Sequence, residues 1–339
     1  MTPLADIIQW NCEGVNPKKG ELEKMATDKD PICIVAQELK LPYNGTCSLP
    51  RYKTFLKNLA VPDGGNAHGG VAVFVRKGVS AYQIDLTTRL QAVAVSVKFK
   101  KRITVCSIYL PPGELIHKHQ LETLIDQLPR PFLLLGDFNA RSKLWYDTTY
   151  CGRGKMIEKL IEEGDFFFLD KNHHTHFSRR HKTFSHIDMS ICSIDLIDAF
   201  TWKVDEDFHN SDHAPIYITS NEPRPTGGVK RWITKKADWT KYRNLTDLDA
   251  EIIKDLPDIE SAENFMTDII LDSAGKSIPT SQGTGKRKSP PWWNNVCYMA
   301  IKKRKSAWRK YEKTTTDENY ATFSKLRAEA QRIIRCSKR

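Results

Sequence analysis

The segment that most constrains the fold spans residues 131–140, which read PFLLLGDFNA. Four consecutive apolar residues, Phe132 to Leu135, are typical of a strand that is buried on both faces of a sheet. The run stops at Gly136, and Asp137 and Asn139 then share a face because alternate residues of a strand point the same way. A simple polar turn would give the same pattern. The segment thus predicts a core strand whose end holds a carboxylate beside an amide.

Other predicted strands also meet polar side chains at one end. These polar residues are Asn11, Glu38, and the pair Asp212 and His213, beside the strands predicted at 5–11, 31–37 and 214–219. Strand ends that gather at one rim of a rigid scaffold are a common place for an active site. We therefore expect these side chains to lie around Asp137 and Asn139.

The other elements of residues 1–220 alternate irregularly between strands and helices. Short β-branched runs separated by turns predict an antiparallel meander at 71–76, 82–86, 92–99 and 103–110. Helical spacing predicts helices at 21–29, 115–128 and 155–163, and two arms of a hairpin are predicted at 175–177 and 183–190. This mixture predicts an α/β (α+β) fold with two sheets.

The pattern changes after residue 220. Residues 221–228, NEPRPTGG, have the composition of a linker. Beyond them only helices are predicted, at 238–253, 261–273, 294–311 and 317–336. The predicted domains are therefore 1–220, a linker with short helices at 221–291, and a basic helical segment at 292–339.

The formal net charge of +11 falls almost entirely on residues 221–339. It therefore says nothing about what residues 1–220 bind. The last two predicted helices are strongly basic, which is typical of a solvated surface. A face that binds nucleic acid is the alternative, because aromatic residues lie among the cations, at Trp292, Trp293, Trp308 and Tyr311.

Composition and motifs also bear on the compartment. No apolar run approaches the ~20 residues that cross a membrane, and the first residues lack the features of a signal peptide. The eight cysteines include no C-x-x-C pair, which disfavours a zinc knuckle and a disulfide framework. We expect an intracellular protein in a reducing compartment that does not enter a membrane.

The polar residues at the strand ends suit metal-assisted hydrolysis of a phosphodiester. Glu38 can bind a hard cation such as magnesium, and Asp137 can orient the attacking water. Asn139 and His213 can donate hydrogen bonds to the charge that develops on the phosphoryl oxygens. Asp188 could fix the tautomer of the histidine and raise its pKa. Taken singly, Glu38 reads as a surface or capping residue and Asp188 as a turn or ion-pair residue.

The order of six motifs resembles the endonuclease/exonuclease/phosphatase family. The motifs are Gln9-Trp10-Asn11, Gln37-Glu38, Tyr109 before Pro111-Pro112, Gly136-Asp137-Phe138-Asn139, His186-Ile187-Asp188 and Ser211-Asp212-His213-Ala214-Pro215. The resemblance covers roughly residues 5–220. It implies a four-layer sandwich of two facing sheets flanked by helices (DNase I-like), with the active site at one rim, followed here by a basic helical extension.

The resemblance also implies roles for metal binding. Glu38 would ligate Mg2+ or Mn2+, with Asn11 close by. Asp212 would lie near the metal or the water, and its role is open because family members differ in how many metals act. Glu13 would be a partner of the metal ligands.

The same resemblance implies roles at the scissile phosphate. Tyr109 and Asn139 would contact this phosphate, and Asp137 would orient or deprotonate the water. Asp188 would support His213. The chemistry requires no small-molecule cofactor.

Within the family, the chain resembles the endonuclease of non-LTR retrotransposons of the arthropod jockey-like type. The segment from His209 to Pro215 and the later Pro291-Trp292-Trp293 carry this likeness. The chain shows no polymerase motif, so we expect an endonuclease with the connector that would lead to a reverse transcriptase, as in a truncated copy.

The implied function is magnesium-dependent nicking of double-stranded DNA in the nucleus, which would prime reverse transcription at the target. The basic tip of the predicted hairpin, with Arg179, Arg180 and Lys182, would contact the DNA backbone, unless it is a solvated turn. Element RNA could bind the basic C-terminal helices. The alternatives are a non-catalytic nucleic-acid-binding remnant and a phosphatase or phosphodiesterase of the same fold.

Overall fold

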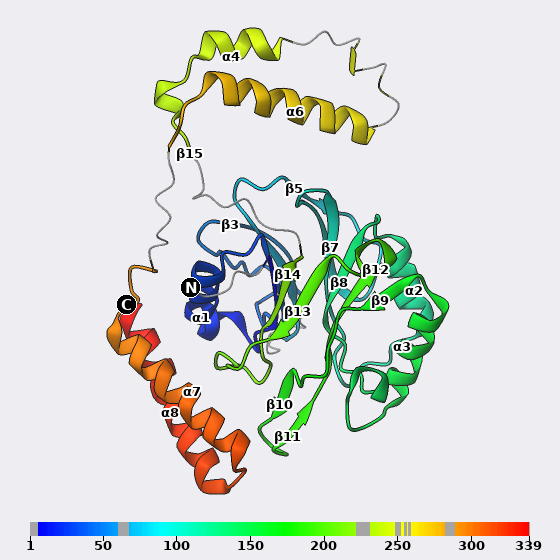
Figure 1. The fold of residues 1–339 in the computed structure, drawn as a ribbon. Coiled ribbons are helices and arrows are strands. Elements are labelled where there is room, and N and C mark those ends of the chain that lie inside the picture. Colours follow the sequence, from blue (N-terminus) through cyan, green and yellow to red (C-terminus); the bar gives the residue numbers. More distant parts are fainter. Residues whose placement is uncertain are drawn as a thin grey trace. The chain divides into compact units, whose positions relative to one another are not determined.

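The structure is a computed structural model that describes residues 6–59, 68–221, 231–247, 252–253, 256, 259–281 and 289–338. The chain divides into two compact units, one formed by 1–222 with 288–339 and the other by 223–287. Two six-stranded sheets form the centre of the first unit (Figure 1).

The first sheet brings the ends of two parallel strands to one edge. Its strand order is β13-β14-β1-β2-β4-β3, with bounds β1 Ile7–Asn11, β2 Cys33–Gln37, β3 Tyr52–Lys57, β4 Val71–Arg76, β13 Phe200–Val204 and β14 Ile216–Ser220. Strands β1 and β2 are parallel, and Asn11 is level with Gln37. Asn11 and the next residue along β2, Glu38, therefore leave the sheet together.

The second sheet supplies the other side of the same edge. Its order is β5-β6-β7-β8-β12-β9, with bounds β5 Ala81–Ile84, β6 Gln91–Lys98, β7 Arg102–Tyr109, β8 Phe132–Asp137, β9 Phe166–Phe168 and β12 Asp188–Ser193. Strand β8 is parallel to β7 and antiparallel to β12, and its Asp137 pairs in register with Tyr109 and Asp188. Three site residues thus form one row across three strands.

Four layers result from packing on both faces of each sheet. Valines and leucines of the two sheets interdigitate between them, among them Val35, Val73, Val95, Val105, Leu133 and Leu135. Helix α1 (Val15–Lys29) covers the outer face of the first sheet through Leu22 and Met25. Helices α2 (Lys118–Asp126) and α3 (Gly152–Glu163) cover the second sheet (Figure 1). The predicted four-layer α/β sandwich is confirmed.

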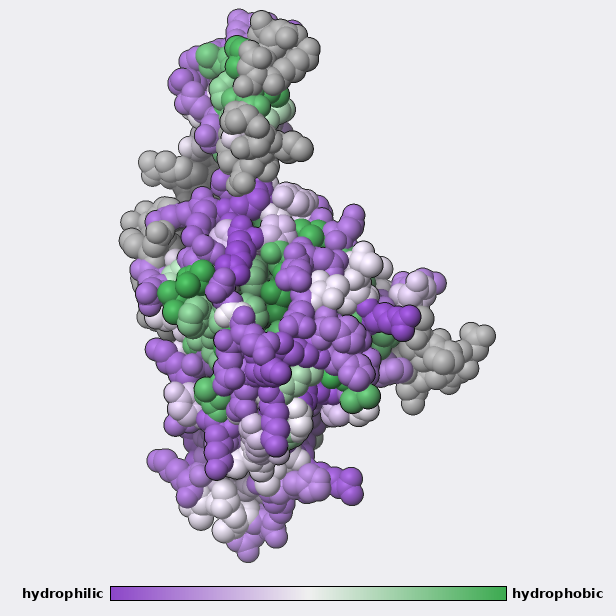
Figure 2. All heavy atoms as spheres, turned by 90° about the vertical axis from the view of Figure 1, so that its right-hand side faces the viewer, coloured by the Kyte–Doolittle hydropathy of each residue, from purple (hydrophilic) through white to green (hydrophobic). Residues whose placement is uncertain are grey.

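Figure 2 shows the face that carries α2 and α3. Hydrophilic side chains predominate there, with smaller hydrophobic areas between them. This pattern is expected for helices that bury one face on a sheet and expose the other to water.

Two local predictions were wrong. Residues 71–76 do not begin a meander with 82–86, because β4 lies in the first sheet between β2 and β3. A strand buried along almost its whole length fits the interior of a sheet, whereas the partly exposed β5 is an edge strand. Residues 183–190 form two strands: β11 (Thr183–Ser185) pairs with β10 (His176–Ser178), and β12 pairs with β8.

The last two helices pack on the sandwich within the first unit. Helices α7 (Asn295–Lys313) and α8 (Asp317–Ser337) form a helical hairpin. An aromatic cluster joins this hairpin to β10 and β11 through Phe177, Trp308, Tyr311 and Phe323. Gly20 of α1 allows a close approach, because a Cβ there would lie 2.8 Å from Ile334 Cγ2 of α8.

The second unit is small. Its helices α4 (Trp239–Thr246) and α6 (Ile259–Ser277) lie between the short paired strands β15 (Arg231–Trp232) and β16 (Thr280–Ser281). The helix predicted at 238–253 ends earlier, at Thr246, and parts of its second half lie outside the described residues. No helix in the described part of the chain has the length and apolar character needed to cross a membrane.

Candidate active site

The candidate site lies where the two sheets meet at one edge, and the side chain of Gln9 is one of the groups that join them. Gln9 of β1 donates from Nε2 to the carbonyl oxygens of Gly136 (3.2 Å) and Met189 (3.1 Å). Gly136 itself has no space for a side chain, because a Cβ would lie 1.8 Å from the Ile108 carbonyl oxygen of β7. The glycine before Asp137 thus permits the close strand packing that aligns the site.

Asp137 is the buried centre of the site, with 1% of its surface exposed. Its Oδ2 accepts hydrogen bonds from Asn11 Nδ2 (2.9 Å) and Asn139 Nδ2 (3.1 Å). Asn139 has a φ of +47°, a left-handed conformation that asparagine tolerates better than most residues, and this bend also directs its backbone N–H to Asp137 Oδ1 (2.9 Å). Burial raises the pKa of Asp137 to about 8, while nearby His213 acts to lower it.

His213 is held between two carboxylates. Its Nδ1 lies 2.7 Å from Asp188 Oδ2, and its Nε2 lies 3.8 Å from Asp137 Oδ2 and 4.0 Å from Asp212 Oδ1. Burial lowers the pKa of His213, but Asp188 and Asp137 outweigh it and raise the value to about 10. The imidazole is therefore a cation that can donate from Nε2 toward the open side of the site.

The loop that carries His213 is tied to β1. Trp10 Nε1 donates to the His213 carbonyl oxygen at 2.9 Å, and Ser211 Oγ donates to the Asn11 carbonyl oxygen at 2.8 Å. These two hydrogen bonds fix the position of His213 relative to Asn11.

Glu38 stands at the more open side of the site. Its Oε1 accepts from the Tyr109 hydroxyl (2.8 Å) and from Asn11 Nδ2 (3.3 Å), and Lys40 Nζ lies 2.8 Å from Oε2. Although burial opposes it, the ammonium of Lys40 lowers the pKa of Glu38. Burial and the negative charge of Glu38 raise the pKa of Tyr109 far above its usual value, so its phenol remains a donor.

The donor set fits a hard divalent cation. Carboxylate and amide oxygens are what such ions prefer, and the lysine ammonium on Glu38 shows that this carboxylate attracts positive charge. Asp137, Asp188 and His213 also form a group whose ligand atoms lie within 4.8 Å of one another, compatible with a divalent metal. In that group, however, the Asp188–His213 hydrogen bond already uses one ligand atom of each residue.

The structure therefore gathers the residues predicted from strand ends and motifs. Around Asp137 lie Asn11, Glu38, Tyr109, Asn139, Asp188, Asp212 and His213. His186, which belongs to one of the motifs, lies apart: its Nε2 is 3.2 Å from Asp170 Oδ2, and its ring stacks on Trp202.

The predicted hairpin tip lies beside the site but is largely paired. Both Nη atoms of Arg179 donate to the Glu13 carboxylate, at 2.9 and 2.7 Å, and the Glu13 N–H donates to Asn11 Oδ1. Lys182 pairs with Asp317 of α8. Arg180 is exposed and has no ion-pair partner among the described residues.

Sequence reasoning missed two residues that hold the site together. The ring centroid of His176 lies 4.6 Å from that of His213, and burial with the neighbouring imidazolium lowers the pKa of His176 to about 3. Arg153 donates to the carbonyl oxygens of Leu110 (3.1 Å) and Phe138 (3.0 Å), which fastens the ends of β7 and β8. Neither residue follows an apolar strand, so the strand-end pattern gave no signal for them.

Comparisons with known proteins agree with this geometry. Residues 103–217 match the family described as Endonuclease-reverse transcriptase. The RNA-directed DNA polymerase from mobile element jockey of Drosophila melanogaster is 24% identical over 83% of this chain, and the probable RNA-directed DNA polymerase from transposon BS of the same species is 27% identical over 82%. The chain spans 31% of the length of each of these curated relatives.

A solved structure carries the likeness to the fold. The endonuclease domain of TRAS1, a telomere-specific non-LTR retrotransposon, superposes with a TM-score of 0.54 at 24% identity, covering 62% of this chain and 95% of that domain. The family resemblance predicted from the motifs is therefore confirmed: this chain has the endonuclease/exonuclease/phosphatase fold and is similar to the endonuclease domain of a non-LTR retrotransposon.

Proposed function

We propose that this chain is a magnesium- or manganese-dependent endonuclease that nicks one strand of double-stranded DNA. The observation that carries the proposal is Asp137, held between Asn139 and the Asp188–His213 pair at the edge where Glu38 stands. The similarity to mobile-element polymerases and to a retrotransposon endonuclease domain supports DNA as the substrate. In the proposed role the nick primes reverse transcription at the target, and we therefore expect the activity in the nucleus.

The geometry assigns a role to each group. Asp137 orients the attacking water and accepts its proton in its carboxylate form, which the positive charge of His213 favours although burial raises the pKa to about 8. His213, Asn139 and Tyr109 donate hydrogen bonds to the phosphoryl oxygens as negative charge develops there. Asp188 holds His213 in its charged form. Glu38 and Asn11 would hold a divalent cation, with Asp212 nearby, and its positive charge would stabilise the same oxygens.

Supercoiled plasmid tests this proposal. In Mg2+ or Mn2+ the chain should produce open-circular DNA, and EDTA should abolish the product until metal is restored. Asp137→Ala and His213→Ala should each slow nicking by roughly 10²-fold or more while DNA binding is retained. Unchanged nicking in both variants would remove the site assignment.

The same assay separates the two alternatives. Binding of plasmid without relaxation by the wild-type chain would identify a non-catalytic nucleic-acid-binding remnant. Release of inorganic phosphate from phosphomonoesters, with intact plasmid, would identify a phosphatase of the same fold.

A further inference from the structure

Helix α8 delivers an arginine to the rim of the candidate site. Arg327 Nη2 donates to the carbonyl oxygen of Asn210 at 2.9 Å. Asn210 precedes Asp212 and His213 in the same loop, so the guanidinium lies next to the catalytic loop although it comes from the end of the chain. This loop and the aromatic cluster around Trp308 hold α8 in place.

Cations around Arg327 outnumber the acids that neutralise them. The Glu13 carboxylate is already taken by both Nη atoms of Arg179 and approached by Lys18 at 3.5 Å. Within the described part of the chain, Arg327 has no carboxylate at ion-pair distance, and its buried Nε has no hydrogen-bond acceptor. Burial and the neighbouring Arg179 lower the pKa of Arg327, and the negative charges of Glu13 and Asp212 offset this only in part.

The basic character continues along one face of α8. Arg327, Gln331, Arg335 and Lys338 follow at intervals of four, four and three residues, which places them on one side of a helix. Arg327 and Arg335 are therefore separated by about 12 Å along the axis. Lys325, two residues before Arg327, lies about 160° around the helix axis from it.

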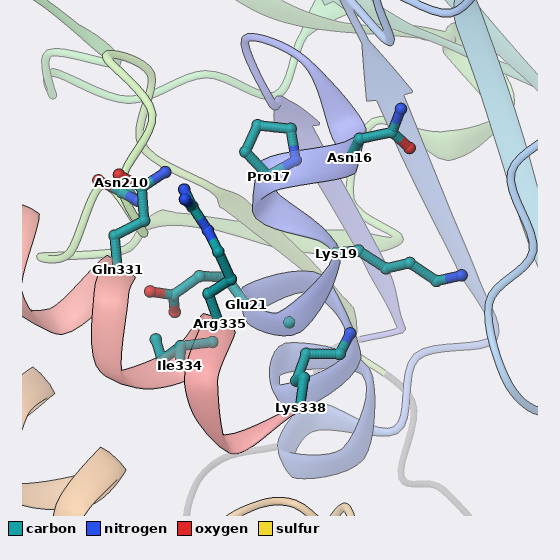
Figure 3. A pocket seen from close by; sticks show the side chains of 10 residues that line it. Asn16, Pro17, Lys19, Glu21, Asn210, Gln331, Ile334, Arg335 and Lys338 are labelled. Atoms are coloured by element: carbon teal, nitrogen blue, oxygen red, sulfur yellow. The ribbon is translucent and has the colours of Figure 1, made fainter.

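A pocket of about 160 Å³ lies where this face meets α1. Asn210, Gln331, Arg335 and Lys338 line it together with residues of α1, including Glu21. Figure 3 shows Arg335 extending from α8 toward Asn210 and Pro17, whereas Lys19 points away from α8. The Oδ1 atom of the buried Asn210 has no hydrogen-bond partner among the described residues.

We propose that Arg327 and Arg335 bind the phosphodiester backbone of the substrate DNA, so that a binding track runs from the active site along this face of α8. The inference rests on the proposed nuclease function and specifies its substrate contacts. DNA carries one negative charge per about 1.7 Å of duplex axis, so a track of about 12 Å meets several phosphates. A phosphate beside the half-buried Arg327 guanidinium adds negative charge next to the arginine pair that Arg327 forms with Arg179.

Salt-dependent binding to a fluorescent duplex in EDTA tests the track without cleavage. Each lost phosphate contact should lower the slope of log K against log salt by about 0.9. Arg327→Gln and Arg335→Gln should each do so, and the double variant should lose about twice as much. Lys325→Gln, at a position about 160° around the axis of α8 from Arg327, is the control and should leave the slope unchanged.

The Arg335→Gln variant distinguishes a loss of phosphate contact from a loss of stability, which Arg327→Gln alone could not do. Arg335 is exposed and donates no side-chain hydrogen bond to any residue that the structure describes, so Arg335→Gln should leave the melting temperature unchanged while the slope falls. If both variants keep the wild-type slope, the track is overturned even when the wild-type chain nicks plasmid. A loss of binding to duplex RNA alone, with DNA binding unchanged, would also overturn it. Failure of the wild-type chain to nick plasmid would overturn the proposed function instead.

Discussion

At the scale of single residues, the first unit contains two buried Asp–His pairs with different surroundings. Asp188 and His213 lie 2.7 Å apart and face Asp137, whereas Asp170 and His186 lie 3.2 Å apart, and Trp202 stacks on the His186 ring. Both pairs are buried. One pair can therefore serve as the control for the other.

Replacing Asp188 with Asn should remove the charge that keeps His213 protonated. We expect kcat for nicking to fall by roughly 10²-fold or more, because the imidazole loses its fixed tautomer and its positive charge. Single-turnover nicking of an oligonucleotide duplex measures this.

Asp170→Asn is the matched control. It removes an equally buried carboxylate from a histidine that does not touch the site, so it should cost stability without changing kcat of the folded protein. An equal loss of kcat in both variants would show that the effect comes from folding rather than from His213.

At the scale of elements, helix α7 is anchored to the catalytic loop by a buried ionic network. Arg304 of α7 is 1% exposed, and its Nη atoms donate at 2.6 Å to Glu21 of α1 and to Asp207 of the loop after β13. His209 lies between Glu21 Oε2 (3.1 Å) and Asp205 Oδ2 (2.9 Å). The helical hairpin and the catalytic loop are therefore held by the same charges.

Arg304→Met should leave two buried carboxylates without their partner. Removing one member of a buried ion pair typically costs about 3–5 kcal/mol, so we expect the free energy of unfolding to fall by about that amount. Chemical denaturation followed by tryptophan fluorescence measures it, since Trp308 lies in the docked cluster.

Arg309→Met provides the comparison on the same helix. Arg309 pairs with Glu206 of the same loop, but both side chains are exposed, and exposed pairs contribute little. A similar loss of stability in both variants would show that burial of the Arg304 network is not what anchors α7.

At the scale of the whole molecule, one ionic network in the first unit joins helix α1 to helix α7. This network makes the stability of the unit depend on pH. Although burial opposes these shifts, the surrounding acids raise the pKa of His209 to about 10, and the pKa values of Glu21 and Asp205 are lowered by Arg304 and His209. Because the histidine pKa is raised on folding, its contribution is complete below 6.5 and is lost as the pH rises toward 10. The carboxylate contributions are complete above 4.5 and are lost as the pH falls.

We therefore expect maximal stability of the first unit between about pH 4.5 and 6.5 and a decline in its melting temperature from there to pH 10. His209→Gln should make the alkaline decline shallower, because one of the two histidines whose pKa is raised to about 10 is gone while His213 still titrates. Thermal melts of both proteins across this range measure the effect. Parallel melting curves for the two proteins would show that another group controls the alkaline decline.

The site residues that could be predicted from the sequence are those marked by a pattern in their immediate neighbours. Asn11, Glu38 and Asp137 each stand at or directly after an apolar run, so the strand-end pattern identified them. His213 was identified in the same way, from the strand predicted at 214–219. The same patterns predicted that there are two sheets. They did not predict that β4 belongs to the first sheet, because a buried β-branched run fits the interior of either sheet.

Contacts between distant segments left no such signal. His176 approaches His213 only because β10 folds back on the catalytic loop, and Arg304 is buried only because α7 packs on α1. As sequence, Arg304 and Arg327 look like the many exposed cations around them. Their roles follow from the carboxylates and carbonyl groups that the fold brings to them.

The hydrogen bonds of Gln9 have a further consequence. Glu38 and Asn11 belong to one sheet, whereas Asp137 and Asp188 belong to the other, and Gln9 fixes the gap between them at the site. The thickness of the hydrophobic interior is therefore also the spacing between the residues proposed to bind the cation and the residues proposed to orient the water. A substitution such as Val95→Ala lies far from the proposed phosphate site. It would still affect the reaction, because the two sheets would move closer together and change the distances between the site residues.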